Sequence, residues 1–420
     1  MNIAVISLLS LFVVVVVSGM LRLNAGVLAL SFAWIIGHYL ANMTVSTVLS
    51  GFPLGLATIL FGITLLFGQA QQNGTLNALA ARALRRTHSH PGLVPIVFFV
   101  LALLLATLGP GNIATVALLA PLAMSVAGKT GVSAFLMTLM LANGANAGAF
   151  SPFAPTGIIA NGLIANLGLT MNPWTQVYVP SLLAQSVVAL AGYLLFGGLR
   201  LWHPTQVPPD PPLLYAPPEA PLTRQQWVTL GAIAVLVIGV VVFKADIGFL
   251  AITLATLLPL LGAANHADAF KLVPWDTIVM VCGVSVLIAL LSATGGMDLF
   301  TTVLARVSTA TNVTGLLALV AGTLSAYSSS SGVVMPTLIA AVPGLMAKLG
   351  GGDAVAMVSA INVGSHLADV SPLSTLGALC IASAASHEDR DVLFRRLLFY
   401  GLAMAVVGAG VSYLFFGLLW

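Results

Sequence analysis

The stretch Gly144-Ala-Asn-Ala-Gly-Ala-Phe-Ser-Pro152 returns 220 residues later as Gly364-Ser-His-Leu-Ala-Asp-Val-Ser-Pro372. Both copies interrupt a long apolar segment with glycine, a serine–proline pair and polar side chains. Other landmarks recur in the same order with little drift: Arg22-Leu-Asn-Ala-Gly26 over Lys244-Ala-Asp-Ile-Gly248 and Gly74 over Gly296 at an offset of 222, and Pro53 and Gly62 over Pro274 and Gly283 at 221. The ordered matches indicate an internal duplication.

The composition predicts an all-α polytopic membrane protein. Of 420 residues, 59% are hydrophobic and 6% charged, against roughly 25% charged residues in soluble domains. The first apolar segment lacks a basic leader, so we expect a retained helix. Ten membrane spans are expected, at about 3–21, 25–42, 53–70, 132–166, 174–201, 227–243, 247–263, 275–293, 353–385 and 395–420.

Two further segments, 92–128 and 312–348, each consist of two apolar arms around a polar tip. The tips are Gly109-Pro-Gly-Asn112 and Ser328-Ser-Ser-Ser-Gly332. The arms are about 15 residues long, shorter than the roughly 20 residues of a full crossing. Each half is therefore expected to hold five transmembrane helices plus one re-entrant helical hairpin.

A proline-rich cytoplasmic linker at 202–225 separates the N-terminal repeat, 1–201, from the C-terminal repeat, 226–420. Five crossings per half invert the second repeat, with both termini outside. Eleven basic residues then fall inside and three outside, which follows the positive-inside bias. This charge split holds equally for re-entrant and membrane-spanning hairpin arms. The expected location is a bacterial-type inner membrane.

Inverted repeats with discontinuous helices place their binding sites near the membrane midplane, where helix ends expose backbone groups. The hairpin tips form one pair of such breaks, with Asn112 and Thr115 in the first and Ser328–Ser331 in the second. Helix-end amides and hydroxyls suit an anion or a partly dehydrated cation. The alternative is a pair of polar turns at the surface.

The second pair of breaks covers Asn143–Gly157 and Asn362–Gly377. Glycine and proline among polar residues predict unwound chain with free carbonyls and side-chain oxygens. The alternative is a packed kink whose hydroxyls bond to their own helix. No lysine or arginine lies near either break in the sequence.

Asp369 is the one carboxylate expected well inside a membrane segment, which makes it a functional candidate. It could coordinate sodium or take up a proton, and His366 could assist the proton. A structural role for His366 is an equal alternative. Asp353 and Ser133 are expected to be equivalent helix N-caps. At the offset of 220, the first half has Asn146 and Ala149 in place of His366 and Asp369.

The sequence holds no phosphate loop, metal-ligand cluster or nucleophile–base arrangement. We therefore expect neither an enzyme nor a cofactor, and no partnership with nucleic acid. Cys282 and Cys380 lie in apolar segments and are expected to be small buried hydrophobes.

The motifs Gly109–Thr115, Asn143–Gly157, Ser328–Pro336 and Gly364–Gly377 resemble the ion transporter superfamily. The chain is most similar to its malonate/C4-dicarboxylate carrier branch, and more distantly to divalent anion:sodium symporters. The resemblance implies a homodimer with a scaffold (1–91 and 226–311) and a mobile transport domain (92–201 and 312–420). It also implies elevator-type transport coupled to sodium or protons. In the symporters each tip carries a Ser-Asn-Thr motif, which this chain retains only in part.

The sequence therefore predicts cation-coupled secondary transport of a small dicarboxylate across the lipid bilayer. Related alternatives are another inorganic or organic anion; unrelated ones are an ion channel, a membrane enzyme or a non-catalytic membrane subunit. The predicted substrate site comprises Asn112, Thr115, Ser151, Thr156, Ser329, Ser330, Ser374 and Thr375. The predicted ion-coupling set comprises Asp369, His366, Asn143, Asn146, Asn362 and Ser365, with a sodium site as the one metal site considered.

Overall fold

The computed structural model describes residues 2–21, 23–85, 91–202, 221–326, 328–384 and 388–418. Within these ranges all regular structure is helical, which confirms the predicted all-α class. Most of the linker predicted at 202–225, namely 203–220, lies outside the described residues, as do Arg22 and Arg86 of the charge count.

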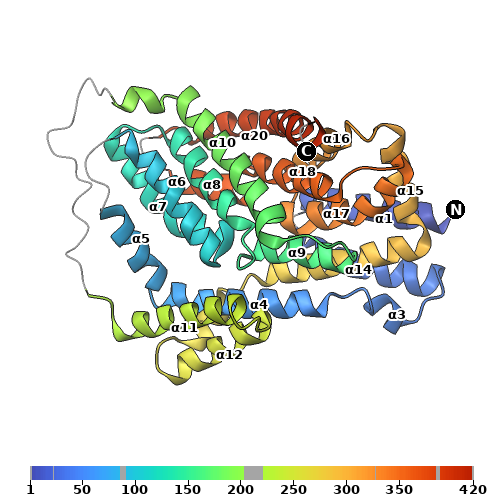
Figure 1. Cartoon of the computed structure of the whole chain (residues 1–420), viewed down its shortest axis with the longest axis horizontal. Coiled ribbons are helices and arrows are strands. Elements are labelled where there is room, and N and C mark those ends of the chain that lie inside the picture. The colour runs from blue at the N-terminus through green and yellow to red at the C-terminus, as the bar shows by residue number, and fades with distance from the viewer. Residues whose placement is uncertain are drawn as a thin grey trace.

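The helices of the first half recur in the same order in the second (Figure 1). The first half holds α1 (Ile3–Leu21), α2 (Ala25–Trp34) with η1 (Ile35–Leu40), α3 (Val45–Leu49), α4 (Leu54–Gln72), α5 (Thr75–Arg85), α6 (Leu93–Leu108), α7 (Gly111–Thr130), α8 (Ala134–Ala149), α9 (Pro155–Asn166), η2 (Pro173–Tyr178) with α10 (Val179–Leu195), and η3 (Gly198–Trp202).

The second half holds α11 (Arg224–Val241), α12 (Ile247–Leu260), α13 (His266–Lys271), α14 (Trp275–Thr294), α15 (Gly296–Arg306), α16 (Val313–Ser325), η5 (Ser330–Val334) with α17 (Met335–Leu349), α18 (Ala354–Leu367) with η6 (Ala368–Val370), α19 (Thr375–Ala382), and α20 (Arg390–Ser412) with η7 (Tyr413–Leu418).

Equivalent helices begin on equivalent caps. The side chain of Ser133 accepts a backbone N–H of α8, and the side chain of Asp353 does the same for α18, so the predicted pair of N-caps is confirmed. Pro53 and Pro274 precede α4 and α14 with nearly the same backbone angles. Some of the sequence landmarks are therefore points where helices start.

Seven described helices are long and apolar enough to cross a membrane. Five of them match expected spans, whereas α2 with η1 and α12 are shorter apolar helices. The other two are the return arms of the predicted hairpins, Gly111–Thr130 and Ser330–Leu349, each 20 residues long. The expectation of 15-residue arms was therefore wrong for the return arms, because each continues past the tip as one unbroken helix.

Close helix crossings join the two predicted scaffold segments. A Cβ on Gly26 would lie 2.1 Å from the carbonyl oxygen of Val279, and one on Gly283 would lie 2.1 Å from that of Gly26. The equivalent glycines repeat the arrangement, since a Cβ on Gly62 would lie 2.6 Å from the carbonyl oxygen of Gly248. The crossing of α2 with α14 thus has a counterpart in that of α4 with α12.

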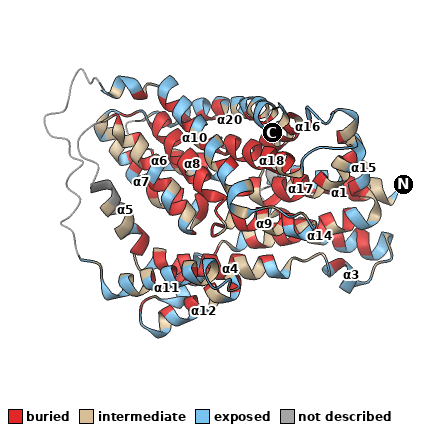
Figure 2. Cartoon of the chain, in the orientation of Figure 1, coloured by how far each residue is buried: buried red, intermediate tan, exposed pale blue. Residues whose placement is uncertain are grey.

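The segments predicted to form the transport domain pack around α8 and α18 (Figures 1 and 2), and the predicted scaffold and transport segments are called the two bodies below. Every residue of α8 is buried, as are Ala356–Leu367 of α18. A helix that is covered on all sides belongs to the interior of a bundle. The arms α6 and α7 pack against α8, and α16 packs against α18 and α20.

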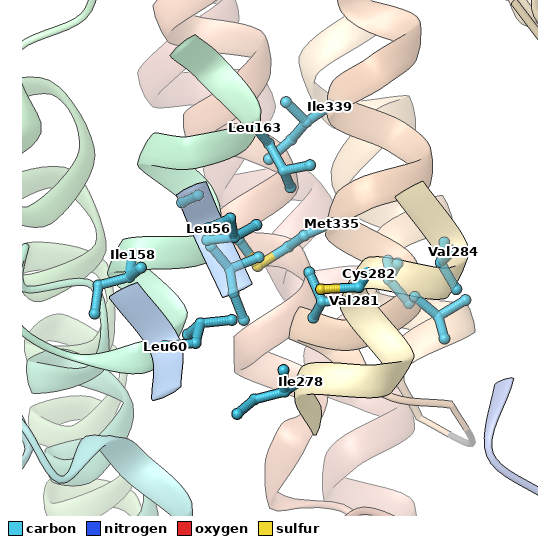
Figure 3. Close-up of a cluster of buried hydrophobic side chains, with 14 of the residues drawn as sticks. Leu56, Leu60, Ile158, Leu163, Ile278, Val281, Cys282, Val284, Met335 and Ile339 are labelled. Atoms are coloured by element: carbon cyan, nitrogen blue, oxygen red, sulfur yellow. The ribbon is translucent and has the colours of Figure 1, made fainter. Parts of the chain in front are cut away.

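An apolar seam joins the two bodies (Figure 3). Leu60 of α4 and Ile278 of α14 belong to one continuous cluster with Ile158 of α9 and Met335 of α17. The contacts along this seam are non-directional. The polar side chains of the predicted site lie at the hairpin tips and the helix breaks, next to this seam.

Candidate functional site at the hairpin tips

The first hairpin tip is shaped by two glycines with positive φ. Gly109 has φ 146°, and a Cβ there would lie 1.9 Å from the ring of Phe67 in α4. Gly111 has φ 75°, and its Cβ would meet the ring of Pro155. Only glycine fits both the backbone angles and the contacts. Asn112 follows in the first turn of α7 and is 7% exposed.

The two breaks share one local geometry. The Ser151 hydroxyl accepts the N–H of Phe153 at 3.2 Å, and the Ser371 hydroxyl accepts that of Leu373 at 3.3 Å. The breaks are nevertheless shorter than predicted, because α8 continues to Ala149 and α18 to Leu367. The expectation that unwinding starts at Asn143 and Asn362 is therefore wrong; the unwound chain comprises about 150–154 and 371–374.

A cavity of about 240 Å³, here called the tip cavity, lies where both tips meet the second break. Six predicted site residues line it, and Asp369 is the one ionisable side chain in its described lining. The scaffold segments add Ser18 and Met280. The predicted residues brought together here are Asn112, Ser329, Ser330, Asp369, Ser374 and Thr375.

Asp369 is held by hydroxyl groups of the second tip. Ser330 Oγ donates to Asp369 Oδ1 at 2.6 Å and makes a close contact with the hydroxyl of Ser325. The Ser374 hydroxyl donates to the backbone carbonyl of Asp369. Asp369 is 8% exposed and has hydroxyl partners and no basic one among these contacts. A carboxylate in such a setting is suited to receive a cation or a proton.

A second cavity of about 690 Å³, here called the mouth cavity, adjoins the first. Asn112, Ser329 and Thr375 line both cavities, and Thr156 lines the mouth cavity alone. Lys271 also lines the mouth cavity, with a side chain 76% exposed and an ion pair to Asp268 at 3.0 Å. The breaks thus have a basic residue nearby in space, although none is near in the sequence.

Asn112 is tied to the second repeat through Asn146. Asn112 Nδ2 donates to Asn146 Oδ1 at 2.8 Å, and Asn146 Nδ2 donates to the backbone carbonyl of His366 at 2.9 Å. Asn146 lies on α8 and is fully buried. It is not among the residues lining either cavity.

The remaining predicted residues lie behind the cavity walls. His366 Nδ1 lies 2.9 Å from the Ser365 hydroxyl, and the ring packs edge-on against Phe150. Asn143 Nδ2 donates to the carbonyl of Leu139. These buried residues, none of which lines the two cavities, are Thr115, Asn143, Ser151, Asn362, Ser365 and His366.

Several lining residues were not predicted. Ser18, Met280 and Lys271 belong to the scaffold segments and reach the cavities only through packing between distant helices. Ser331 lies within the predicted tip and lines both cavities. The serine run was the one sequence signal that pointed to any of them.

Comparison with known proteins gives two similarities. Residues 1–149 match the family model described as dicarboxylate carrier protein MatC N-terminus. Among curated proteins, none matches the chain. The solved structures include a similar fold, described as the crystal structure of the Alcanivorax borkumensis YdaH transporter with an unusual topology. It superposes with a TM-score of 0.57 at 18% identity, over 89% of this chain and 88% of that one.

These similarities and the seven long apolar helices indicate a multi-pass membrane protein of transporter fold. Among the described residues no group of three or more metal-ligating side chains occurs.

Proposed function

We propose that this chain is a cation-coupled secondary transporter of a small dicarboxylate of the malonate or C4 class. The observation that carries the proposal is the tip cavity, in which both hairpin tips and the second break converge around Asp369. Its volume of about 240 Å³ suits a small solute, since pockets for drug-sized ligands occupy roughly 300–1,000 Å³. The family match of residues 1–149 supports the substrate class.

The lining favours an anion held by neutral donors. Asn112, Ser329 and Thr375 line both cavities and offer amide and hydroxyl donors. Asn112 and Ser330 also lie in the first turn of their return helices, where free backbone N–H groups favour negative charge. Lys271 at the mouth is paired with Asp268, and Asp276 lines the same cavity, so the mouth adds no net positive charge to the path of entry.

Asp369 supports coupling to a cation. An ionised carboxylate and a dicarboxylate in one small cavity repel each other, by about 4 kcal/mol per pair of unit charges at 4 Å and an effective dielectric constant near 20. A sodium ion or a proton at Asp369 removes this repulsion, so substrate and cation bind better together than apart. Both coupling ions remain in the proposal.

We infer that access alternates by an elevator-type movement of the transport segments along the apolar seam. The second return arm, α17, packs against α14 and α15, whereas the first return arm, α7, packs against α6, α8 and α19. The mouth cavity lies beside the first tip and the turn around Lys271, on the face predicted to be cytoplasmic, and a further cavity of about 820 Å³ lies toward the predicted outer face, beside Leu54 and Leu167. This asymmetry between equivalent arms fits one end state of an alternating cycle.

A homodimer also remains part of the proposal. Within the single chain α11 is the least covered of the long apolar helices, with 17% of its apolar window buried. Its outward face includes Trp227, Val235 and Ile238, each more than half exposed. Lipid and a second copy are the two environments that would cover such a face.

Uptake into proteoliposomes tests the proposed function. Radiolabelled malonate and succinate would be offered with sodium and pH gradients imposed separately. We expect accumulation above equilibrium under at least one gradient and saturation with substrate. Conductance without saturation would indicate a channel, and activity only with an added protein would indicate a subunit. Failure to accumulate any dicarboxylate under either gradient would overturn the proposal.

A further inference from the structure

The contact between Asn112, Asn146 and His366 fixes the direction of two amide groups. A backbone carbonyl can only accept a hydrogen bond, so the atom of Asn146 that lies 2.9 Å from His366 O must be Nδ2. The opposite atom, Oδ1, then faces Asn112. Because that oxygen can only accept, Asn112 must present its NH₂ group to it, at 2.8 Å. The usual ambiguity of amide orientation is thereby removed.

This orientation of the amides decides whether Asn112 presents a hydrogen-bond donor or an acceptor to the cavity. Asn112 Oδ1 accepts the N–H of Ile113 at 2.9 Å, so its accepting side is turned toward its own helix. One N–H of Asn112 is used by Asn146, and the second is left as a donor. A donor is what an anion needs, whereas an acceptor at the same place would repel it.

The contact also joins the two repeats at one point. Asn146 and His366 are related by the offset of 220 residues that relates Gly144 to Gly364. They are thus equivalent positions that touch each other. His366 lies two residues before the start of η6 and three residues before Asp369. The contact between Asn146 and His366 therefore links the first tip to the break that carries the Asp369 carboxylate.

We propose that Asn146 is a positioning residue that sets the amide orientation of Asn112 and holds the first tip against the second break. This assignment rests on the proposed function for its effect on substrate. It replaces the role of ion ligand that the sequence suggested for Asn146. The residue acts entirely through Asn112 and is itself sealed in α8.

A double-mutant cycle tests whether Asn146 acts through Asn112. Asn146→Leu keeps the side-chain size and removes the hydrogen bonds to Asn112 and to the His366 carbonyl. We expect the KM for dicarboxylate uptake to rise about tenfold or more, with a smaller change in maximal rate. In an Asn112→Ala background the same change should have no further effect on KM. Independent, additive effects of the two substitutions would overturn the proposal.

Two further variants guard against a merely structural loss. Asn146→Asp, when protonated, keeps one donor and one acceptor and should restore most of the affinity. Thr138→Val removes another fully buried polar group from α8, one whose hydroxyl donates to the carbonyl of Ala134 in its own helix and also contacts the Cys380 thiol, and should leave KM unchanged. If Asn146→Leu does not fold, Asn146→Ser takes its place in the cycle. An equal rise in KM for Thr138→Val would contradict the assignment.

A substrate-free measurement separates this proposal from the proposed function. Ile113 in the first tip and Ser331 in the second tip line both cavities, so each is replaced in turn by a single cysteine as a labelling site. The native Cys282 and Cys380 are buried. With Asn146→Leu we expect maleimide to label Ile113→Cys about fivefold faster or more, and Ser331→Cys at an unchanged rate. An unchanged rate at Ile113→Cys would overturn the positioning role, whichever substrate the protein carries.

Discussion

At the scale of single residues, Asp369 is the group on which the coupling proposal depends. It is 8% exposed, and its carboxylate accepts a hydrogen bond from Ser330 at 2.6 Å. Hydroxyl groups solvate a carboxylate without neutralising it. The remaining charge is therefore available to a mobile cation, and a bound dicarboxylate increases the demand for one.

Replacing Asp369 by Asn should abolish coupling. The amide is similar in size but carries no charge, so binding of the anion no longer needs a cation beside it. We expect uptake that equilibrates substrate without accumulating it, and a loss of dependence on the sodium or pH gradient. Uptake into proteoliposomes under each gradient measures this.

Asp391→Asn, which alters an exposed acid at the start of α20, provides the control and should keep full coupling. Unchanged ion dependence in Asp369→Asn would assign Asp369 a structural role.

At the scale of helices, the scaffold crossings depend on glycine and the seam between the bodies depends on apolar contact. Gly26 brings α2 against the backbone of α14, so the crossing distance is set by the absence of a side chain. The seam along α4, α9, α14 and α17 is made of apolar side chains at its labelled residues (Figure 3). In the proposed elevator mechanism the glycine crossings would lie within the scaffold, and the apolar seam would lie between the scaffold and the transport domain.

Gly26→Ala should destabilise the protein, because its Cβ would lie 2.1 Å from the carbonyl oxygen of Val279 and the helices would have to separate. We expect a loss of about 1–3 kcal/mol, typical of overpacking. Gly231→Ala is the matched control, since no atom lies within 4 Å of its Cβ position in α11. It should be neutral or stabilising. Thermal unfolding of the purified proteins distinguishes the two, and equal melting temperatures would contradict the prediction.

Lys348 of α17 and Asp298 of α15 form an ion pair across the two bodies, at 2.6 Å. The aspartate side chain is 75% exposed, so the pair contributes at most about 1 kcal/mol. Because the pair must separate if α17 leaves α15, we expect Lys348→Met to shift the balance of end states by about two- to fivefold.

The labelling rate of Thr156→Cys in the mouth cavity measures that shift. The charge exchange Lys348→Asp with Asp298→Lys should restore the original rate. A rate that is the same in Lys348→Met as in its parent would show that the pair does not bias the states.

At the scale of the whole molecule, the order of the helices and their crossings occurs twice. Gly283 of the second half packs on the carbonyl oxygen of Gly26, and its equivalent in the first half, Gly62, packs on that of Gly248. Such reciprocal contacts are typical of units related by a two-fold axis. With an odd number of crossings in each half, the predicted topology places both termini outside and the 202–225 linker inside.

Reporter fusions test this topology. A fluorescent protein inserted in the linker should fluoresce in the cytoplasm, and an alkaline phosphatase joined to the C-terminus should be active outside. The reverse pattern would overturn the orientation, and reporters active on opposite sides at the two termini would overturn the inversion.

Local signals were read correctly where local chemistry decides the structure. Ser133 and Asp353 cap their helices as expected, because capping needs only a side-chain acceptor and the next turn. The positions of the breaks were predicted correctly, but their predicted length was too great. Asn143 and Asn362 were expected to break their helices, whereas both lie inside buried helices. Tertiary packing overrides weak propensity at such positions.

The sequence by itself determined the helical class, the duplication, the tips and breaks, and Asp369 as the buried carboxylate. Only the tertiary structure decided that Lys271 lines the mouth cavity and that Asn146 holds Asn112. The physical reason is that a helix apolar on all sides has no amphipathic pattern from which its packing partners could be predicted. Caps, glycines and prolines act within a turn or two of chain, whereas the contacts of the site join residues 34 positions apart (Asn112 and Asn146), 39 apart (Ser330 and Asp369) and 220 apart (Asn146 and His366).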